Sequence, residues 1–494
     1  MSETFDVREA TIKQVQDAYR ARTLTVREVV QAYLDRIESI DRSGAELNSV
    51  VSLSPRALDD ADALDRVFTE SGEFTGSLHG VPVLVKDQIE VGGMPTSYGS
   101  EIAATFVPAK DSTAVAELRR AGAVVLGTTT MPDFATSWFS TSSRSGVTKN
   151  PYDLSRDPGG SSSGSAAAIA ANLALVGIGG DTGGSIRLPA SFCNLVGMRV
   201  TPGLISRVGM SSLVLPQDTP GPITRTVEDA ARLLDVLVGF DPEDPYTSVN
   251  HIAAHSGSFT DGLAESTVAG KRIGVLREAF GDENDPDGAR VNAVIEDALD
   301  KINAAGGETV DVHIDDLMHL VGFTSLYNTR SHADMDAFFA TRPESGVTSM
   351  SDVVASDRFH PKLDLLIGIA ESSPNPKDDP EYLDRILVQQ EFQRAVVSML
   401  AERGLDAIVF PDVKLPAPTH NDVFSDKWTC LTYPTNTVIA SQLHFPAITV
   451  PAGFTDNGLP VGLEIMSGPY DEKRLMLVAA AIEKATDARR APEL

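Results

Sequence analysis

Cysteine is scarce in this sequence of 494 residues, which contains only Cys193 and Cys430. Two thiols cannot make a disulfide framework, and their spacing matches no metal-binding pattern. We therefore expect an apolar core to hold the fold, and 42% hydrophobic residues are enough to build one. Cys193 follows Ala190-Ser191-Phe192 and is expected to be a buried small residue rather than a nucleophile.

Positive charge and long apolar runs are also in short supply. The 41 lysines and arginines are outnumbered by 69 acidic residues, which gives a net charge of −28. This balance opposes binding to nucleic acid or to an anionic membrane, because both need a basic face. No apolar run reaches the roughly 18 residues of a membrane span, and the N-terminal MSETFDVREATIK has no apolar region of a secretion signal. We therefore expect a cytoplasmic protein.

Glycine and serine, in contrast, are concentrated in one stretch, Asp157 to Gly203. Two clusters, Gly159 to Gly164 and Gly183 to Ser185, flank an alanine-rich helix pattern and a short apolar strand, Leu175 to Ile178. Glycine reaches backbone angles that other residues avoid, and consecutive N–H groups of such a turn can bind an anion. A serine beside these groups could attack a carbonyl while they hold the resulting oxyanion.

Other interpretations of these clusters fit the sequence less well. Glycine-serine clusters are commonly turns or linkers, but apolar helix and strand patterns interrupt this one. A dinucleotide loop fails because Thr182 stands where a glycine is required, and no Gly-Lys-Ser/Thr of a Walker A loop is present. Gly160 to Gly164 fits G-x-S-x-G formally, yet turn residues rather than a strand precede it, which disfavours a nucleophile elbow.

An unusual lysine closes the apolar strand predicted over Val81 to Lys86. Lys86 could extend its ammonium group to solvent from the strand end. Alternatively, Lys86 is buried and acts as a base, for which its pKa must fall by about 3 units at a cost of about 4 kcal/mol. The strand alone does not separate these interpretations.

Three segments together resemble the amidase signature family of serine hydrolases. They read GGSSSGSAAAIAA, GGDTGGSIRLPASFCNLVGMRVTPG and LHGVPVLVKD, and weaker likeness extends over nearly the whole chain. The resemblance implies an α/β fold with a large mixed, mostly parallel twisted sheet covered by helices on both faces. The predicted helix Ser112 to Ala121 and strand Ala123 to Thr128 agree with it, because they form the crossover unit of such sheets.

The resemblance also implies the domain organisation. A single domain would span residues 1–494, with N-terminal helices over 1–75 and the motif-bearing core over 76–240. A variable region at about 315–430 would shape the substrate pocket. Members of the family are often dimers, so the resemblance leaves a homodimer open.

Matched position by position, the resemblance implies a Ser-Ser-Lys triad. The nucleophile would be Ser185, the bridging serine Ser161, and the base a neutral Lys86. A cis peptide bond would precede Ser161. The resemblance implies further roles for nearby residues. The oxyanion hole would be formed by the N–H groups of Thr182, Gly183, Gly184 and Ser185, supporting contacts would come from Ser162, Asp181 and Arg187, and substrate contacts from Phe134, Ala135 and Gly160.

The nine histidines offer no rival chemistry, since none lies in a Ser-His-Asp hydrolase context or a metal-binding pattern. We expect no metal and no cofactor. The resemblance implies hydrolysis of a carboxylic amide to acid and amine through an acyl-enzyme on Ser185, with ester and carbamate hydrolysis as related activities. The alternative is a glutaminase-type component of an amidotransferase that works with a partner. That role usually places the protein close to a bound tRNA, and the net charge of −28 argues against it because tRNA is also negatively charged.

Overall fold

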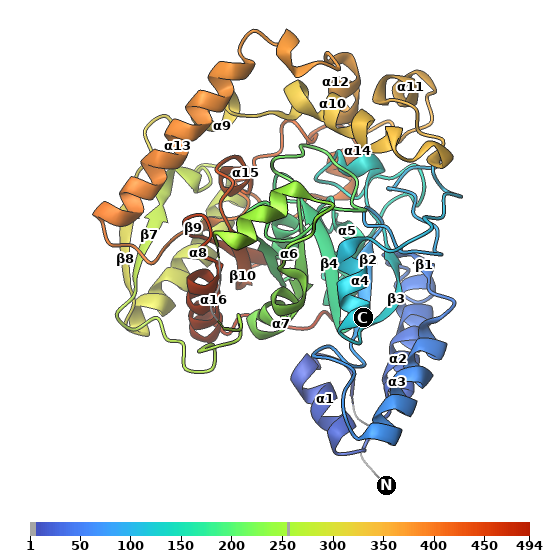
Figure 1. The fold of residues 1–494 in the computed structure, drawn as a ribbon. Coiled ribbons are helices and arrows are strands. Elements are labelled where there is room, and N and C mark those ends of the chain that lie inside the picture. The colour runs from blue at the N-terminus through green and yellow to red at the C-terminus, as the bar shows by residue number, and fades with distance from the viewer. Residues whose placement is uncertain (1–5, 254–256) are drawn as a thin grey trace.

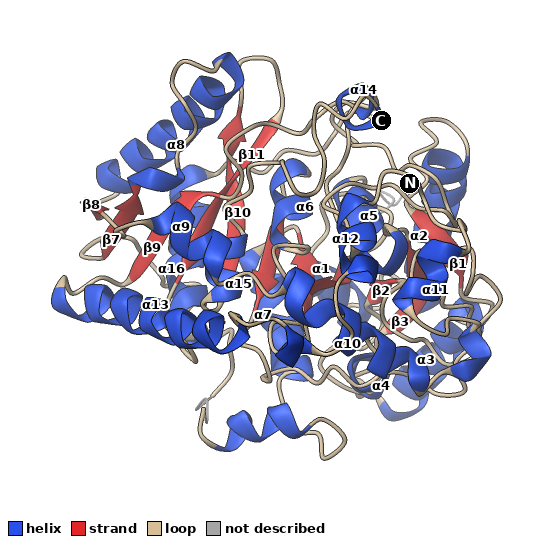
Figure 2. Ribbon diagram, turned by 90° about the horizontal axis from the view of Figure 1, so that it is seen from above, coloured by secondary structure: helices blue, strands red, loops and turns tan. Residues whose placement is uncertain are grey.

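The computed structural model describes residues 6–253 and 257–494, so the first residues of the expected N-terminal segment lie outside it. Within these ranges, eleven strands form one sheet with helices on either side (Figures 1 and 2). The strand order is β1-β3-β2-β4-β6-β5-β10-β11-β9-β7-β8. The strands are β1 (Val50–Leu53), β2 (Pro82–Lys86), β3 (Val124–Thr129), β4 (Val176–Asp181), β5 (Val196–Arg199), β6 (Thr219–Thr224), β7 (Arg272–Leu276), β8 (Glu308–Val312), β9 (Ala407–Pro411), β10 (Ala447–Phe454) and β11 (Pro460–Met466).

The sheet is mixed, as expected, but the expectation of mostly parallel strands is wrong. Among the described strands, β2 runs parallel to β3 and β4, and β7 runs parallel to β8 and β9, while the other six pairings are antiparallel. One cause is β6, which runs against both β4 and β5. Its sequence TPGPIT contains two prolines, which argue against a central strand when only the sequence is known.

Sixteen α-helices are described, and the first two begin at capping boxes. Thr11 and Thr25 both close capping boxes, with Gln14 and Glu28 as the reciprocal partners. Within the described ranges, no helix combines the length and the apolar character that crossing a membrane requires. The helices are α1 (Ile12–Arg20), α2 (Val26–Arg36), α3 (Ala57–Ser71), α4 (Thr113–Arg120), α5 (Ser163–Ala170), α6 (Arg187–Phe192), α7 (Val227–Leu237), α8 (Pro286–Ala304), α9 (Leu317–Phe323), α10 (Tyr327–Ala340), α11 (Met350–Ala355), α12 (Asp364–Glu371), α13 (Tyr382–Glu402), α14 (His420–Phe424), α15 (Val438–Gln442) and α16 (Glu472–Thr486).

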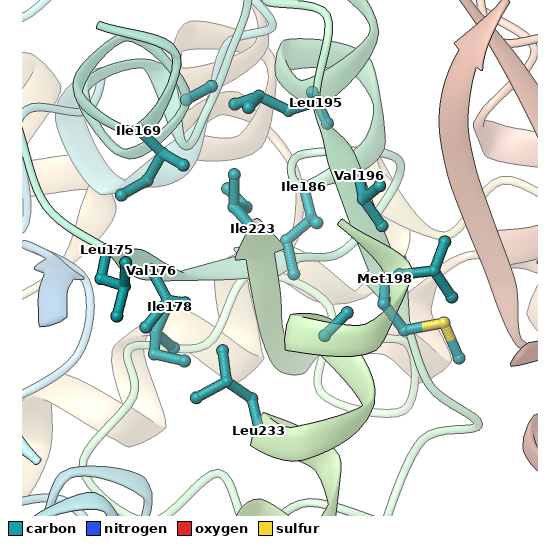
Figure 3. Close-up of a cluster of buried hydrophobic side chains, with 14 of the residues drawn as sticks. Ile169, Leu175, Val176, Ile178, Ile186, Leu195, Val196, Met198, Ile223 and Leu233 are labelled. Atoms are coloured by element: carbon teal, nitrogen blue, oxygen red, sulfur yellow. The ribbon is translucent and has the colours of Figure 1, made fainter. Parts of the chain in front are cut away.

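Part of the apolar core lies around β4, β5 and β6 (Figure 3). Ile169 of α5 and Ile223 of β6 are both fully buried there. A Cβ atom at Gly177 of β4 would lie 3.0 Å from Ile169 Cγ1, and one at Gly179 would lie 2.8 Å from Ser162 Oγ. The absence of side chains on β4 therefore lets the glycine-serine segment before α5 approach the strand.

The helices α9 to α13 lie above the sheet in Figure 1, and α10, α11 and α12 contribute buried residues to a second apolar cluster. That cluster includes Phe339 of α10 and also Phe134, which comes from the loop after β3. The two rings meet edge to face with centroids 5.5 Å apart. The helix α10 thus packs directly against the loop at the end of β3.

Candidate active site

Lys86 lies at the carboxyl end of β2, and its side chain is completely buried. Its Nζ atom donates to Ser161 Oγ at 2.7 Å and to the carbonyl oxygen of Gly180 at 3.1 Å. The lysine therefore does not extend to solvent. Burial lowers its pKa to about 7, and the negative charges of Asp181 and Asp218 oppose that shift. A lysine in this setting can supply a neutral amine near neutral pH.

The two glycine-serine clusters meet beside this lysine. The peptide bond between Gly160 and Ser161 is cis, as the resemblance implies. The Ser162 N–H group donates to the carbonyl oxygen of Ser185 at 3.1 Å, and Ser162 Oγ accepts from the Gly180 N–H group at 3.3 Å. Ser162 therefore ties the segment before α5 to both β4 and the turn that follows it.

Ser185 is the most accessible of the three residues expected to form the triad. It keeps 5% of its surface exposed, whereas Lys86 and Ser161 are 0% exposed. Its hydroxyl group makes no hydrogen bond with a described residue, and in particular none with Ser161. Hydrogen bonds of catalytic groups are often longer without substrate and shorten when it binds. Of the three residues, only Ser185 therefore has side-chain or backbone surface left exposed.

Asp181 holds the turn that carries Ser185. Its Oδ1 atom accepts from the Gly184 N–H group at 3.0 Å, and its Oδ2 atom accepts from the Ile186 N–H group at 3.1 Å. Gly184 is therefore not a free donor in this structure, contrary to the expectation that it lines the oxyanion hole. The N–H groups of Thr182, Gly183 and Ser185 have no acceptor among the described residues, so these three remain available to an oxyanion.

Two buried arginines fix Asp181 in turn. Arg187 donates to both carboxylate oxygens, through Nε at 3.2 Å and Nη2 at 3.1 Å. Arg199 of β5 donates through Nη1 to Asp181 Oδ1 at 2.9 Å, a contact that sequence reasoning missed. Burial alone would raise the pKa of Asp181, but the two arginines hold it well below its usual range. Asp181 is therefore ionised, which strengthens its hydrogen bonds to the turn.

The three residues expected to contact substrate are all buried. Phe134 is 1% exposed and packs in the apolar cluster that contains Phe339. Both Phe134 and its neighbour Ala135 have positive φ angles. A Cβ atom at Gly160 would lie 3.0 Å from the carbonyl oxygens of Ser137 and Phe139. The structure thus places Gly160 against backbone and Phe134 within the apolar cluster.

Two aromatic side chains that sequence reasoning missed, those of Trp138 and Tyr327, lie beside Gly183. A Cβ atom at Gly183 would be 2.0 Å from Tyr327 Oη and 3.6 Å from Trp138 Cζ2. The Tyr327 hydroxyl makes no hydrogen bond with a described residue, whereas the buried Tyr19 and Tyr433 donate to backbone carbonyls. Burial raises the pKa of Tyr327 well above its ordinary value, so the phenol stays protonated. No motif in the sequence marks Tyr327, which begins α10.

The described residues offer no site for a metal in the usual sense: none of their His, Cys, Asp and Glu side chains gather in groups of three or more suited to an ion. Cys193 is fully buried, and burial raises the pKa of its thiol well above the ordinary value. This surrounding disfavours the reactive thiolate. The chemistry available at the turn is therefore that of hydroxyl groups, a buried amine and backbone N–H groups.

Comparison with known proteins identifies the family to which this sheet and its helices belong. The family model described as Amidase matches residues 28–476. Among curated relatives, a glutamyl-tRNA(Gln) amidotransferase subunit of Methanosarcina mazei is 33% identical over 98% of both chains. The solved peptide amidase of Stenotrophomonas maltophilia is 33% identical, with a TM-score of 0.86 over 99% of both chains. A solved subunit of the glutamyl-tRNA(Gln) amidotransferase of Thermotoga maritima is 26% identical, with a TM-score of 0.76 over 99% of both chains.

The chain belongs to the amidase family. It is an amidase in the broad sense, an enzyme that acts on carbon–nitrogen bonds.

Proposed function

We propose that this protein hydrolyses a carboxylic amide to an acid and an amine through an acyl-enzyme on Ser185. The observation that carries the proposal is the buried hydrogen bond between Lys86 Nζ and Ser161 Oγ, in a segment whose next residue, Ser162, donates to the backbone of the partly accessible Ser185. A serine hydroxyl is a weak nucleophile unless an adjacent base activates it. Lys86 supplies such a base without histidine.

The chemistry would proceed by a proton relay. Neutral Lys86 accepts the proton of Ser161, and Ser161 accepts that of Ser185 as Ser185 Oγ bonds to the carbonyl carbon. The N–H groups of Thr182, Gly183 and Ser185 hold the oxyanion, and one such donor is typically worth about 3–4 kcal/mol. The proton returns along the relay to the leaving nitrogen as the carbon–nitrogen bond breaks. Water activated by the same relay then hydrolyses the acyl-enzyme.

The aromatic side chains beside Gly183 favour an apolar or aromatic group next to the scissile carbonyl. Trp138 and Tyr327 both approach Gly183, and each is half-buried. Such surfaces suit aromatic and aliphatic groups better than a charged one. Esters and carbamates present the same carbonyl to the same donors, so we extend the proposal to them.

The sequence relatives favour a second candidate, a glutaminase-type component that works with a partner. The curated relatives from Methanosarcina mazei and Bdellovibrio bacteriovorus are both named as subunits of glutamyl-tRNA(Gln) amidotransferase, at 33% and 31% identity. The solved structures point the other way, because the peptide amidase has a TM-score of 0.86 and the amidotransferase subunit of Thermotoga maritima one of 0.76. The two candidates share the reaction of Ser185 and differ in substrate and partner.

One experiment tests the reaction and separates the candidates. The purified protein and its Ser185→Ala variant are compared for product release from alkyl amides, an anilide, a carbamate, an ester and glutamine. We expect the wild type to cleave the anilide and related apolar amides, and S185A to lose this activity by at least a thousandfold. Equal cleavage by both proteins would show that Ser185 is not the nucleophile.

The pattern of substrates decides between the two roles. Cleavage of apolar amides without glutaminase activity supports a free-standing amidase. Glutamine as the sole good substrate, together with a partner that co-purifies and stimulates the reaction, supports the amidotransferase role.

A further inference from the structure

A cluster of five charged side chains lies beneath the turn that carries Ser185. Asp181, Asp412 and Glu464 provide the acids, and Arg187 and Arg199 provide the bases. All five residues are 0% exposed. With every group ionised, three negative charges face two positive ones. Because an unbalanced charge is costly in a buried site, one of the acids is expected to hold a proton.

Two oxygen atoms in this cluster identify where that proton lies. Asp412 Oδ2 and Glu464 Oε2 are both buried and have no hydrogen-bond donor among the described residues. The two carboxyl groups are nevertheless within hydrogen-bonding reach of each other. A single proton between them satisfies both oxygens and brings the net charge of the cluster to zero.

The strand pairing creates the space for this contact. Asp412 follows β9, and β11 lies beside it with Gly462 and Glu464 two residues apart on one face. A Cβ atom at Gly462 would lie 2.5 Å from Asp412 Oδ2. Any larger residue at this position would collide with the Asp412 carboxyl group, so glycine keeps the path to Glu464 open.

The other contacts decide which acid carries the proton. Glu464 Oε1 accepts a hydrogen bond from Arg187 Nη1, which favours the ionised form of Glu464. Asp412 Oδ1 accepts only from the neutral Thr449 hydroxyl at 2.6 Å, and no arginine among the described residues donates to it. Burial and then the charge of Glu464 raise the pKa of Asp412 well above its usual value. Asp412 is therefore the acid that stays neutral.

We propose that Asp412 is a positioning residue that works as a neutral carboxylic acid, donating its Oδ2–H to Glu464. Glu464 then holds Arg187, Arg187 holds Asp181, and Asp181 holds the Gly184 and Ile186 N–H groups on either side of Ser185. The proton on Asp412 thus helps to fix the nucleophile and the oxyanion donors. The kinetic part of this inference rests on the proposed function of Ser185.

The protonation state is tested first by infrared spectroscopy, which does not depend on activity. The difference spectrum of wild type minus Asp412→Asn at pH 7 should contain the carbonyl band of a protonated carboxylic acid. Asp406→Asn serves as the matched control, because Asp406 lies just before β9 and pairs with Lys271 at 3.3 Å, outside the cluster. The D406N difference spectrum should lack this band. The difference spectrum of wild type minus Glu464→Gln should also contain this band, because charge balance in the Glu464→Gln variant favours an ionised Asp412.

Kinetics test the positioning role. Asparagine can donate to Glu464 as the acid does, so D412N should keep kcat within about threefold of the wild type. Asp412→Ala should lower kcat at least tenfold with a change in KM below threefold.

Absence of the acid band in the wild-type minus D412N spectrum would overturn the proposal, as would equal loss of kcat in D412N and D412A. If D412A does not fold, the spectra of D412N and E464Q still decide the protonation state. If S185A proves fully active, the proposed function fails, while the infrared result for Asp412 still stands.

Discussion

Lys86 Nζ and Ser161 Oγ lie 2.7 Å apart across 75 residues of sequence. The contact follows from the sheet, because β2 pairs in parallel with β4 and the two strands end at the same edge. The segment before α5 packs onto the glycines of β4 and delivers Ser161 to the buried amine. Because the lysine is buried at this position, its pKa is lowered.

The first prediction concerns the pH dependence of activity. Only neutral Lys86 can accept a proton, and burial lowers its pKa to about 7. We expect kcat/KM for the best amide to rise about tenfold per pH unit below pH 7 and to level off above it. Initial rates measured from about pH 5.5 to 9 check this. A rate that falls steadily as the pH rises through 7 would contradict a lysine base.

The second prediction concerns stability, using Lys86→Met. The folded pKa of about 7 is below the unfolded value of about 10.4, so the unfolded state binds an extra proton between these values. The wild type should therefore gain about 1.4 kcal/mol of unfolding free energy per pH unit across this window, and K86M should not. Denaturant unfolding of both proteins at pH 7, 8 and 9 measures the difference. Parallel pH profiles would show that Lys86 is charged in the folded protein at pH 7.

The third prediction concerns Tyr327→Phe. The Tyr327 hydroxyl has no partner among the described residues and lies over Gly183, so we expect it to bind substrate. Its removal should lower kcat/KM about tenfold, the value of one hydrogen bond, without lowering Tm. Tyr433→Phe is the matched control, because Tyr433 Oη donates to the Pro416 carbonyl at 2.8 Å. Y433F should lower Tm and change kcat/KM less. The reverse pattern would assign Tyr327 a structural role.

The fourth prediction concerns Gly184→Ala. Gly184 has φ of +125°, and a Cβ atom there would lie 1.8 Å from Thr437 Oγ1, which donates to the Gly183 carbonyl at 2.8 Å. Alanine should therefore displace the turn, lowering kcat at least a hundredfold and stability by about 2 kcal/mol. Gly239→Ala is the control, since a Cβ atom there meets nothing within 4 Å. Near-normal kcat in G184A would show that the turn tolerates displacement.

Much of the local structure could be predicted from the sequence. The helix α4 and strand β3 lie within one residue of their predicted ends, and β3 runs parallel to β2 as the crossover unit requires. Apolar periodicity and capping residues are local signals, so they identify such elements well. The strand β6 could not be predicted, because its two prolines are atypical of a central strand. The antiparallel centre of the sheet depends on β6, so it could not be predicted either.

The candidate site divides in the same way. Lys86 and the two glycine-serine clusters stand in recognisable motifs, so the sequence singled them out as one chemical unit. Tyr327 and Asp412 have no such motif. Their places depend on α10 packing above the turn and on β9 pairing with β11, which only the folded chain reveals.

The sequence by itself determined the elements and the segments that carry the chemistry, because backbone preferences and motif spacing act over a few residues. The tertiary structure alone decided which donors are free. It gave the Gly184 N–H group to Asp181 and left those of Thr182, Gly183 and Ser185 without an acceptor among the described residues. It also enclosed three acids with two arginines, 277 residues separating Arg187 from Glu464. Burial sets such charges against one another, and burial exists only once distant strands have paired.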